Sequence, residues 1–244
     1  MKRLYIIKLG STFSATKRQL GDFDQWTREA LGPLDVGIDV VDVLQGASLP
    51  AEEECAGVVV LGSHAMVTDN LPWSVELEGW LTRLLTAGIP LFGICYGHQL
   101  LVRAAGGQVD YHPQGPCFGT VDVHLLPECS DDPLFRSLPQ SFRVHISHSQ
   151  SVVNLPQGAT RLATAAHDPN HAVRLGDCAW GVQFHPEYRA EIVRSYIQQQ
   201  ERGLTSAGID VAALLNEVSE TPIAARILRE FGRFVERRLD DTVV

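Results

Sequence analysis

The feature that most constrains the fold is an alternation of strand patterns with helical patterns in the first half of the chain. The strand patterns are short, mostly apolar runs at residues 4–9, 36–43, 57–62 and 89–94. Leucines and a tryptophan recur at helical spacing over residues 77–85, and a second helix is expected over residues 97–105. Strands that alternate with helices imply a parallel sheet with right-handed crossovers. We therefore predict an α/β fold with a mostly parallel central sheet flanked by helices.

A different pattern begins near residue 108. Short β-like segments separated by turns predict antiparallel additions to the parallel core, at residues 119–126, 143–146, 159–165, 171–175 and 179–184. Helices are expected over residues 190–202 and 209–218 and after Thr221-Pro222. We divide the chain into one domain over residues 1–200 and a helical C-terminal extension over residues 201–244 that packs on the same domain.

Composition argues against several classes of protein. The 244 residues carry a net charge of -9, which argues against a nucleic-acid or anionic-membrane surface. No run reaches the ~18 apolar residues of a transmembrane helix, and the N-terminus lacks the apolar region of a signal peptide. The 5 cysteines have no CxxC spacing, so we expect no disulfide framework, no metal site and a reducing, cytoplasmic location.

The strongest candidate for chemistry is Cys95, in the segment GICYGHQ at residues 93–99. Small residues on both sides of a nucleophile, between a buried strand and a helix, are typical of a nucleophile elbow. Such a turn places the sulfur at the carboxyl end of the sheet, and the positive N-terminus of the next helix favours its thiolate. The alternative is a buried structural cysteine, which the flanking Gly93 and Gly97 make the weaker interpretation.

A cysteine nucleophile needs a base and a group that orients the base, and residues 180–187 (WGVQFHPE) supply both. Residues two apart in an extended chain point to the same side, so we expect His185 and Glu187 to meet, with Pro186 stiffening the link. Glu187 would then fix the tautomer that His185 presents to Cys95. Taken alone, His-Pro-Glu is more often a surface turn.

A third element is the strand end VLGSH at residues 60–64. We expect the backbone N–H groups of Gly62 and Ser63, with that of Tyr96, to face the oxygen that becomes negative during attack. This signal is weak by itself, because strands often end in Gly-Ser.

Together these elements resemble the class I, or triad, glutamine amidotransferases. That family combines a G-x-C-x-G-x-Q elbow, a later H-P-E and an earlier glycine-rich oxyanion loop, in this order. The segment ISHSQSV at residues 146–152 also resembles the family's S-H-x-x-x-V segment, whose backbone holds the α-amino and α-carboxylate groups of glutamine. The resemblance covers about residues 4–200 and is closest to free-standing GMP-synthase-like members of the family.

The resemblance implies a flavodoxin-like fold, L-glutamine as substrate, no cofactor, and a Cys95, His185 and Glu187 triad. It also implies that glutamine is bound by Gln99, Ser147, His148 and Ser149. The family's oxyanion loop is usually Gly-Gly-Pro, whereas here Ser63 and His64 follow Gly62. A second departure is that no synthetase domain is expected in residues 201–244, so ammonia would pass to a separate synthetase or ligase partner.

Three functions stay open at this point. The first is a glutamine amidotransferase or glutaminase that supplies ammonia to a partner. The second is a γ-glutamyl hydrolase that uses the same triad on γ-glutamyl amines or peptides. The third is a non-catalytic binding protein on this fold, which the intact triad disfavours. The ammonia acceptor, the oligomeric state and the role of the C-terminal helices are not determined by the sequence.

Overall fold

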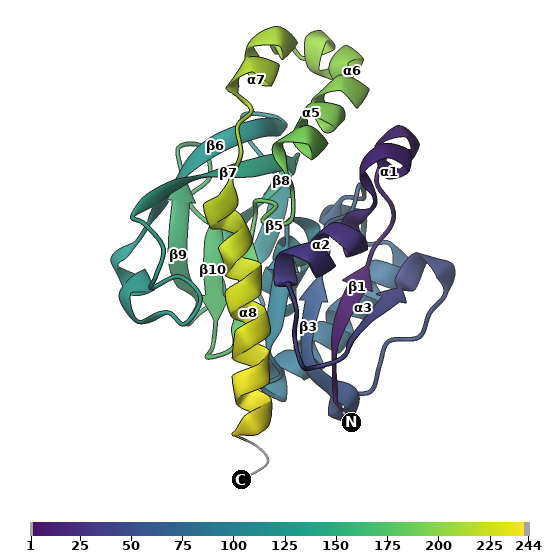
Figure 1. The fold of residues 1–244 in the computed structure, drawn as a ribbon, viewed down its shortest axis with the longest axis vertical. Helices are drawn as coiled ribbons and strands as arrows, with labels where there is room; N and C mark the ends of the chain where they lie inside the picture. Colours follow the sequence, from purple (N-terminus) through teal and green to yellow (C-terminus); the bar gives the residue numbers. More distant parts are fainter. Residues whose placement is uncertain (1, 242–244) are drawn as a thin grey trace.

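A nine-stranded sheet in the order β2-β1-β3-β4-β11-β10-β9-β6-β7 forms the centre of the computed structural model, which describes residues 2–241 (Figure 1). The parallel strands are β1 (Arg3–Lys8), β2 (Ile38–Asp42), β3 (Cys55–Val60), β4 (Leu91–Ile94) and β11 (Ala179–Val182). The antiparallel strands are β6 (Cys117–Leu125), β7 (Ser141–His148), β9 (Thr160–Ala165) and β10 (Ala172–Leu175). The predicted fold class is confirmed. A separate antiparallel pair joins β5 (Gln108–Tyr111) to β8 (Gln150–Asn154).

Strand β11 differs from its predicted place among the antiparallel additions. It pairs in parallel with β4, with Val182 opposite Ile94, and antiparallel only with β10. Its four residues are all buried, as expected for a strand covered on both faces. On one face Gly181 makes room for α4, because a Cβ atom there would lie 2.3 Å from Nδ1 of His98. The ends of β4 and β11 are therefore neighbours, and the segments that follow them meet.

Helices cover both faces of the parallel strands. α2 (Phe23–Leu31) and α8 (Pro222–Asp240) pack in one apolar cluster with Leu4 and Ile6 of β1. α3 (Pro72–Thr86) and α4 (Tyr96–Ala104) pack in a second cluster with Ile7 of β1, on the opposite face. This alternation follows from the two-residue period of a strand. No helix within residues 2–241 is both long and apolar enough to cross a membrane.

The shorter helices gather near the carboxyl ends of the parallel strands, at the top of Figure 1. They are α1 (Ser14–Leu20), α5 (Ala190–Gln199), α6 (Glu201–Ser206) and α7 (Val211–Glu217). The helix predicted over residues 190–202 is therefore divided between α5 and α6. Short 3₁₀ helices occupy Val43–Gln45, Glu52–Glu54, Val67–Asp69 and Pro127–Asp131.

The last helix, α8, crosses the centre of the sheet rather than its margin (Figure 1). The Phe231 ring lies 5.4 Å from that of Phe92 in β4, and the Phe234 ring lies 4.9 Å from that of Trp180 in β11. The helix begins at Pro222, where the missing N–H costs no helical hydrogen bond. The division of the chain at residue 200 stays a prediction, and residues 242–244 of the predicted extension lie outside the described residues.

Two glycines allow α4 to pack directly on the sheet. A Cβ atom on Gly97 would lie 2.2 Å from the carbonyl oxygen of Val60 in β3, and one on Gly93 would lie 2.5 Å from the carbonyl oxygen of Gly97. Neither contact leaves room for a side chain, because each opposing atom belongs to the backbone. The strand-to-helix turn at Cys95 is therefore held tightly against β3.

We expect Gly97→Ala to lower the free energy of unfolding by about 1–3 kcal/mol, because the new methyl group would force α4 away from β3. Gly79→Ala in α3 is the matched control, since a Cβ atom there meets nothing within 4 Å. Removing an exposed helical glycine should raise stability by about 0.5–1 kcal/mol. Urea denaturation measures both, and equal stability of the two variants would contradict this account of the contact.

Candidate active site

Cys95 sits at the bend between β4 and α4 with a strained backbone. Its φ is 51° and its ψ is -101°, a conformation that L residues rarely adopt. Cys95 is 6% exposed and is the N-cap residue of α4, so it lies at the positive end of the helix dipole, where the first N–H groups have no partner within the helix. A strained residue of this kind costs about 1–3 kcal/mol, and the packing of Gly93 and Gly97 holds it in place.

His185 and Glu187 meet, but not through an extended chain as predicted. β11 ends at Val182, and the chain turns at Pro186 and Glu187. The turn brings Nδ1 of His185 within 2.8 Å of Oε1 of Glu187, with both side chains buried. The ring of Tyr188 stacks on the imidazole at 4.0 Å between centroids and 11° between planes. Carboxylate and stacked ring together fix the orientation of His185.

Gly62 adjoins both Cys95 and His185. A Cβ atom on Gly62 would lie 3.1 Å from Cε1 of His185 and 3.9 Å from Cβ of Cys95. Burial lowers the pKa of His185, but the charges of Glu187 and Cys95 and hydrogen bonds to both outweigh burial and raise it to about 10. The imidazole is therefore held as imidazolium at neutral pH, next to the Cys95 sulfur.

The residues predicted to form an oxyanion hole lie around the same sulfur. Tyr96 is the first residue of α4, where an amide N–H has no partner within the helix. The Ser63 hydroxyl donates to the carbonyl of Leu9 at 2.8 Å and accepts from the amide of Ala65 at 3.2 Å. These side-chain bonds shape the loop and leave the backbone of Gly62 and Ser63 beside Cys95.

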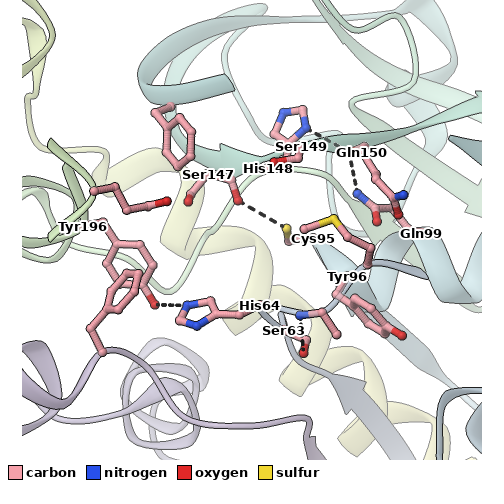
Figure 2. A pocket seen from close by; sticks show the side chains of 15 residues that line it. Ser63, His64, Cys95, Tyr96, Gln99, Ser147, His148, Ser149, Gln150 and Tyr196 are labelled. Atoms are coloured by element: carbon pink, nitrogen blue, oxygen red, sulfur yellow. Dashed lines mark hydrogen bonds between the residues drawn. The ribbon is translucent and has the colours of Figure 1, made fainter. Parts of the chain in front are cut away.

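A cavity of about 240 Å³ opens beside Cys95 (Figure 2). Predicted site residues that line it are Ser63, Cys95, Tyr96, Gln99, Ser147, His148 and Ser149. The Cys95 thiol lies 3.8 Å from the carbonyl oxygen of Ser147, so β7 borders the nucleophile directly. Gly62, His185 and Glu187 do not line the cavity, but Gly62 adjoins both Cys95 and His185, and His185 is hydrogen-bonded to Glu187. Elements distant in the sequence thus bring all the predicted site residues to one place.

The opposite wall of the cavity was not predicted. Tyr196 of α5 lies across the opening from Cys95 (Figure 2). Its hydroxyl is 2.7 Å from Oγ1 of Thr12 and 3.4 Å from Nε2 of His64. The Phe13 ring packs 4.7 Å from that of His64. No local motif marks these residues, because they meet only when α5 folds back over the N-terminal loop.

Gln183 is a second omission, and here the sequence did carry a signal. It interrupts the apolar run before His185, and its side chain is fully buried. Its Nε2 lies 3.6 Å from Sγ of Cys95. A buried polar residue needs a hydrogen-bond partner, so a glutamine in such a run indicates a polar contact inside the core.

We expect Cys95→Gly to be more stable than Cys95→Ala by about 1 kcal/mol, since glycine relieves the positive φ. At an ordinary position the order is the reverse, because glycine loses more chain entropy on folding. Urea denaturation of the two variants measures the difference. An alanine variant as stable as the glycine variant would show that the bend at residue 95 is unstrained.

Comparison with protein families agrees with this geometry. Residues 20–201 match the family model described as glutamine amidotransferase class-I, which is well over half of the chain. Among curated relatives, the glutamine-hydrolyzing GMP synthase of Porphyromonas gingivalis W83 is 38% identical over 141 residues, covering 55% of this chain and 26% of that protein. The corresponding protein of Bacillus pumilus is 41% identical over 154 residues, covering 62% and 28%. The chain thus matches only about a quarter of the length of these relatives.

Solved structures extend the likeness over nearly the whole chain. A glutamine amidotransferase of Thermotoga maritima has a TM-score of 0.76 and 27% identity, covering 96% of this chain and 98% of that one. A glutamine amidotransferase of Methylobacillus flagellatus, at 22% identity and a TM-score of 0.72, shares the fold. With the elbow, the H-P-E segment and the family match in agreement, the chain belongs to the class I glutamine amidotransferase family.

Proposed function

We propose that this protein hydrolyses the side-chain amide of L-glutamine to glutamate and ammonia. The observation that carries the proposal is a strained cysteine at a helix N-terminus, beside an imidazole that Glu187 holds at 2.8 Å, next to an open cavity. These are the parts that nucleophilic catalysis on an amide requires: a nucleophile, an acid–base and a group that orients it. Membership of the family supports the same reaction.

In the first half of the reaction, the Cys95 thiolate attacks the carbonyl carbon of the glutamine side chain. Backbone N–H groups of Tyr96 and of the Gly62-Ser63 loop stabilise the negative oxygen of the tetrahedral intermediate. His185 then gives its proton to the nitrogen, the C–N bond breaks, and ammonia leaves. A γ-glutamyl thioester on Cys95 remains.

In the second half, neutral His185 takes a proton from water, and the resulting hydroxide attacks the thioester carbonyl. The C–S bond breaks, and Cys95 regains its thiolate beside imidazolium. The γ-carboxylic acid that leaves gives its proton to the solvent and becomes glutamate. Glu187 keeps the ring oriented in both halves, because its carboxylate accepts from Nδ1 whichever charge the ring carries. The net reaction consumes one water and one glutamine.

We also propose that the α-amino and α-carboxylate groups of glutamine bind along residues 147–149, with Gln99 at the end of the same cavity. The volume of about 240 Å³ lies below the roughly 300–1,000 Å³ of sites for drug-sized ligands, which favours a substrate as small as an amino acid. Nδ1 of His148 donates to the carbonyl of Gln150 at 3.0 Å, so this ring nitrogen is engaged within the protein. We propose that the backbone of the segment holds the two groups of glutamine.

For the ammonia, we propose a synthetase or ligase partner as the acceptor. Ammonia becomes mostly ammonium in neutral water, so a sheltered transfer preserves its nucleophilicity. The names of the curated relatives pair glutamine hydrolysis with GMP synthesis in one protein, which supports a link of this kind. We further propose a cytoplasmic location, which the five free cysteines favour.

The direct test is release of ammonia and glutamate from L-glutamine, alone and with γ-glutamyl amines and peptides. We expect turnover of glutamine and its loss by a factor of at least about 10³ in Cys95→Ala, because Cys95 is the cysteine among the described residues that line the cavity. Circular dichroism checks that the variant is folded. Ammonia release that survives in Cys95→Ala would remove the mechanism, and preferred turnover of γ-glutamyl conjugates would assign the site to a hydrolase of those compounds.

The raised pKa of His185 predicts a pH dependence. His185 must be protonated to release ammonia, so kcat should fall as the pH rises through about 10. Glu187→Gln removes the largest raising influence, so the pKa of His185 should fall and the alkaline limb should move down by about one unit or more. By linkage, the protonated ring also stabilises the fold below its unfolded pKa of about 6.5, and this contribution is lost by pH 10.

The matched control for that experiment is Glu191→Gln, the same change on an exposed carboxylate in α5. It should leave the alkaline limb where the unmodified protein has it. If the two substitutions gave the same pH profile, Glu187 would have no part in holding the charge on His185.

A further inference from the structure

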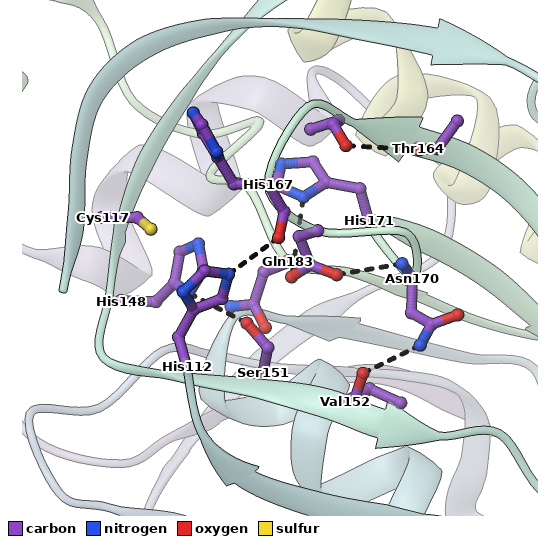
Figure 3. Close-up of polar contacts among 12 residues, drawn as sticks. His112, Cys117, His148, Ser151, Val152, Thr164, His167, Asn170, His171 and Gln183 are labelled. Atoms are coloured by element: carbon purple, nitrogen blue, oxygen red, sulfur yellow. Dashed lines mark hydrogen bonds and ion pairs between the residues drawn. The ribbon is translucent and has the colours of Figure 1, made fainter. Parts of the chain in front are cut away.

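Gln183, which the proposed mechanism does not use, belongs to a series of buried hydrogen bonds that begins at Gln150, passes through Gln99 and reaches Cys95. Gln183 donates from Nε2 to Sγ of Cys95 at 3.6 Å, and its side chain is fully buried. Its backbone N–H is fixed by the carbonyl of His171 at 2.9 Å. Figure 3 shows Gln183 within the polar cluster that includes His171 and Ser151. An amide is thus built into the wall behind the reacting atom.

The direction of the Gln183 amide follows from its neighbours. The backbone carbonyl of Gln150 can only accept a hydrogen bond, and Nε2 of Gln99 lies 2.6 Å from it. The NH₂ end of Gln99 must therefore face that carbonyl. The same NH₂ group lies 3.0 Å from Oε1 of Gln183. Because the Gln183 oxygen accepts from Gln99, the NH₂ end of the Gln183 amide is the end that faces the sulfur of Cys95.

The start of this series of hydrogen bonds is itself fixed. The Oε1 atom of the Gln150 side chain accepts from the amide of Val67 at 2.9 Å, and its Nε2 donates to Oγ1 of Thr68 at 2.6 Å. Nδ1 of His148 also donates to the Gln150 carbonyl, at 3.0 Å. The carbonyl that orients Gln99 therefore belongs to a residue of β8 whose side chain is itself hydrogen-bonded, which holds the carbonyl in place.

The sulfur of Cys95 lies between contacts of opposite kind. The Ser147 carbonyl, at 3.8 Å, accepts from a thiol and repels a thiolate. The Gln183 N–H favours the thiolate, which only accepts hydrogen bonds. Loss of the proton to His185 thus weakens the contact with Ser147 and strengthens the contact with Gln183. When Cys95 becomes a thiolate, its favourable contact with the Gln183 amide therefore offsets its unfavourable contact with the Ser147 carbonyl.

We propose that Gln183 positions Cys95 and stabilises its thiolate, and that Gln99 sets the direction of the Gln183 amide. This inference rests on the proposed role of Cys95 as nucleophile. Gln99 then has a task besides lining the glutamine site, because both protons of its amide nitrogen are directed to Gln150 and Gln183. If Gln99 only filled space in the cavity wall, its amide group would not need to be directed at both Gln150 and Gln183.

The test is the rate of alkylation of Cys95 by iodoacetamide as a function of pH, followed by mass spectrometry of the peptide that contains it. Iodoacetamide reacts with the thiolate and needs no glutamine site. In Gln183→Met, which keeps the shape but loses the donor, the inflection should move up by about one pH unit. Gln183→Glu should move it further, and kcat should fall in both variants.

Gln99→Met tests the orienting step, since it leaves Gln183 in place but frees its amide to turn. The inflection should move in the same direction by a smaller amount, which also decides the matter if Gln183→Met does not fold. Gln157→Met, in an exposed loop, is the control and should match the unmodified protein.

The outcomes separate this inference from the proposed function. A lower melting temperature with an unmoved inflection in the Gln183 and Gln99 variants would show a purely structural role and overturn the inference, with Cys95 still the nucleophile. Ammonia release that persists after complete alkylation of Cys95 would instead overturn the proposed function.

Discussion

The close approach of α4 to β3 is the contact on which the rest of the site depends. Because residues 93 and 97 have no side chains, the first turn of the helix rests on the carbonyl of Val60, and the residue between strand and helix must bend sharply. That residue is Cys95, at a φ of 51°. Tight packing of the sheet and helix thus supplies the energy that holds a strained nucleophile beside the helix N-terminus.

A second constraint places the base. β11 lies next to β4 in parallel, so the segments that leave the two strands emerge at the same edge of the sheet. Aromatic side chains of α8 cover one face of β11, and α4 packs against Gly181 on the other. His185 is therefore fixed by a buried scaffold, and burial keeps the carboxylate of Glu187 close to it without competing water. The high pKa of His185 is a consequence of this arrangement.

How much the sequence reveals depends on how local each feature is. The elbow and the meeting of His185 with Glu187 were predictable, because each depends on a few adjacent residues. The parallel pairing of β11 was not, since four buried residues have the same pattern in either direction. The wall around Tyr196 depends on the return of α5 over the N-terminal loop. Gln183 falls between these cases: its burial was foreseeable, but its partner was not.

The central claim is that the sulfur of Cys95 attacks glutamine, and covalent labelling with a reactive glutamine analogue tests this claim most directly. A glutamine analogue with a chloroketone in place of the amide binds as the substrate does and alkylates a thiolate in reach of its carbonyl. The account predicts one label per chain, on Cys95, with complete loss of ammonia release and with protection by L-glutamine. A label on the partly exposed Cys117 instead, or a rate of labelling that glutamine leaves unchanged, would contradict it.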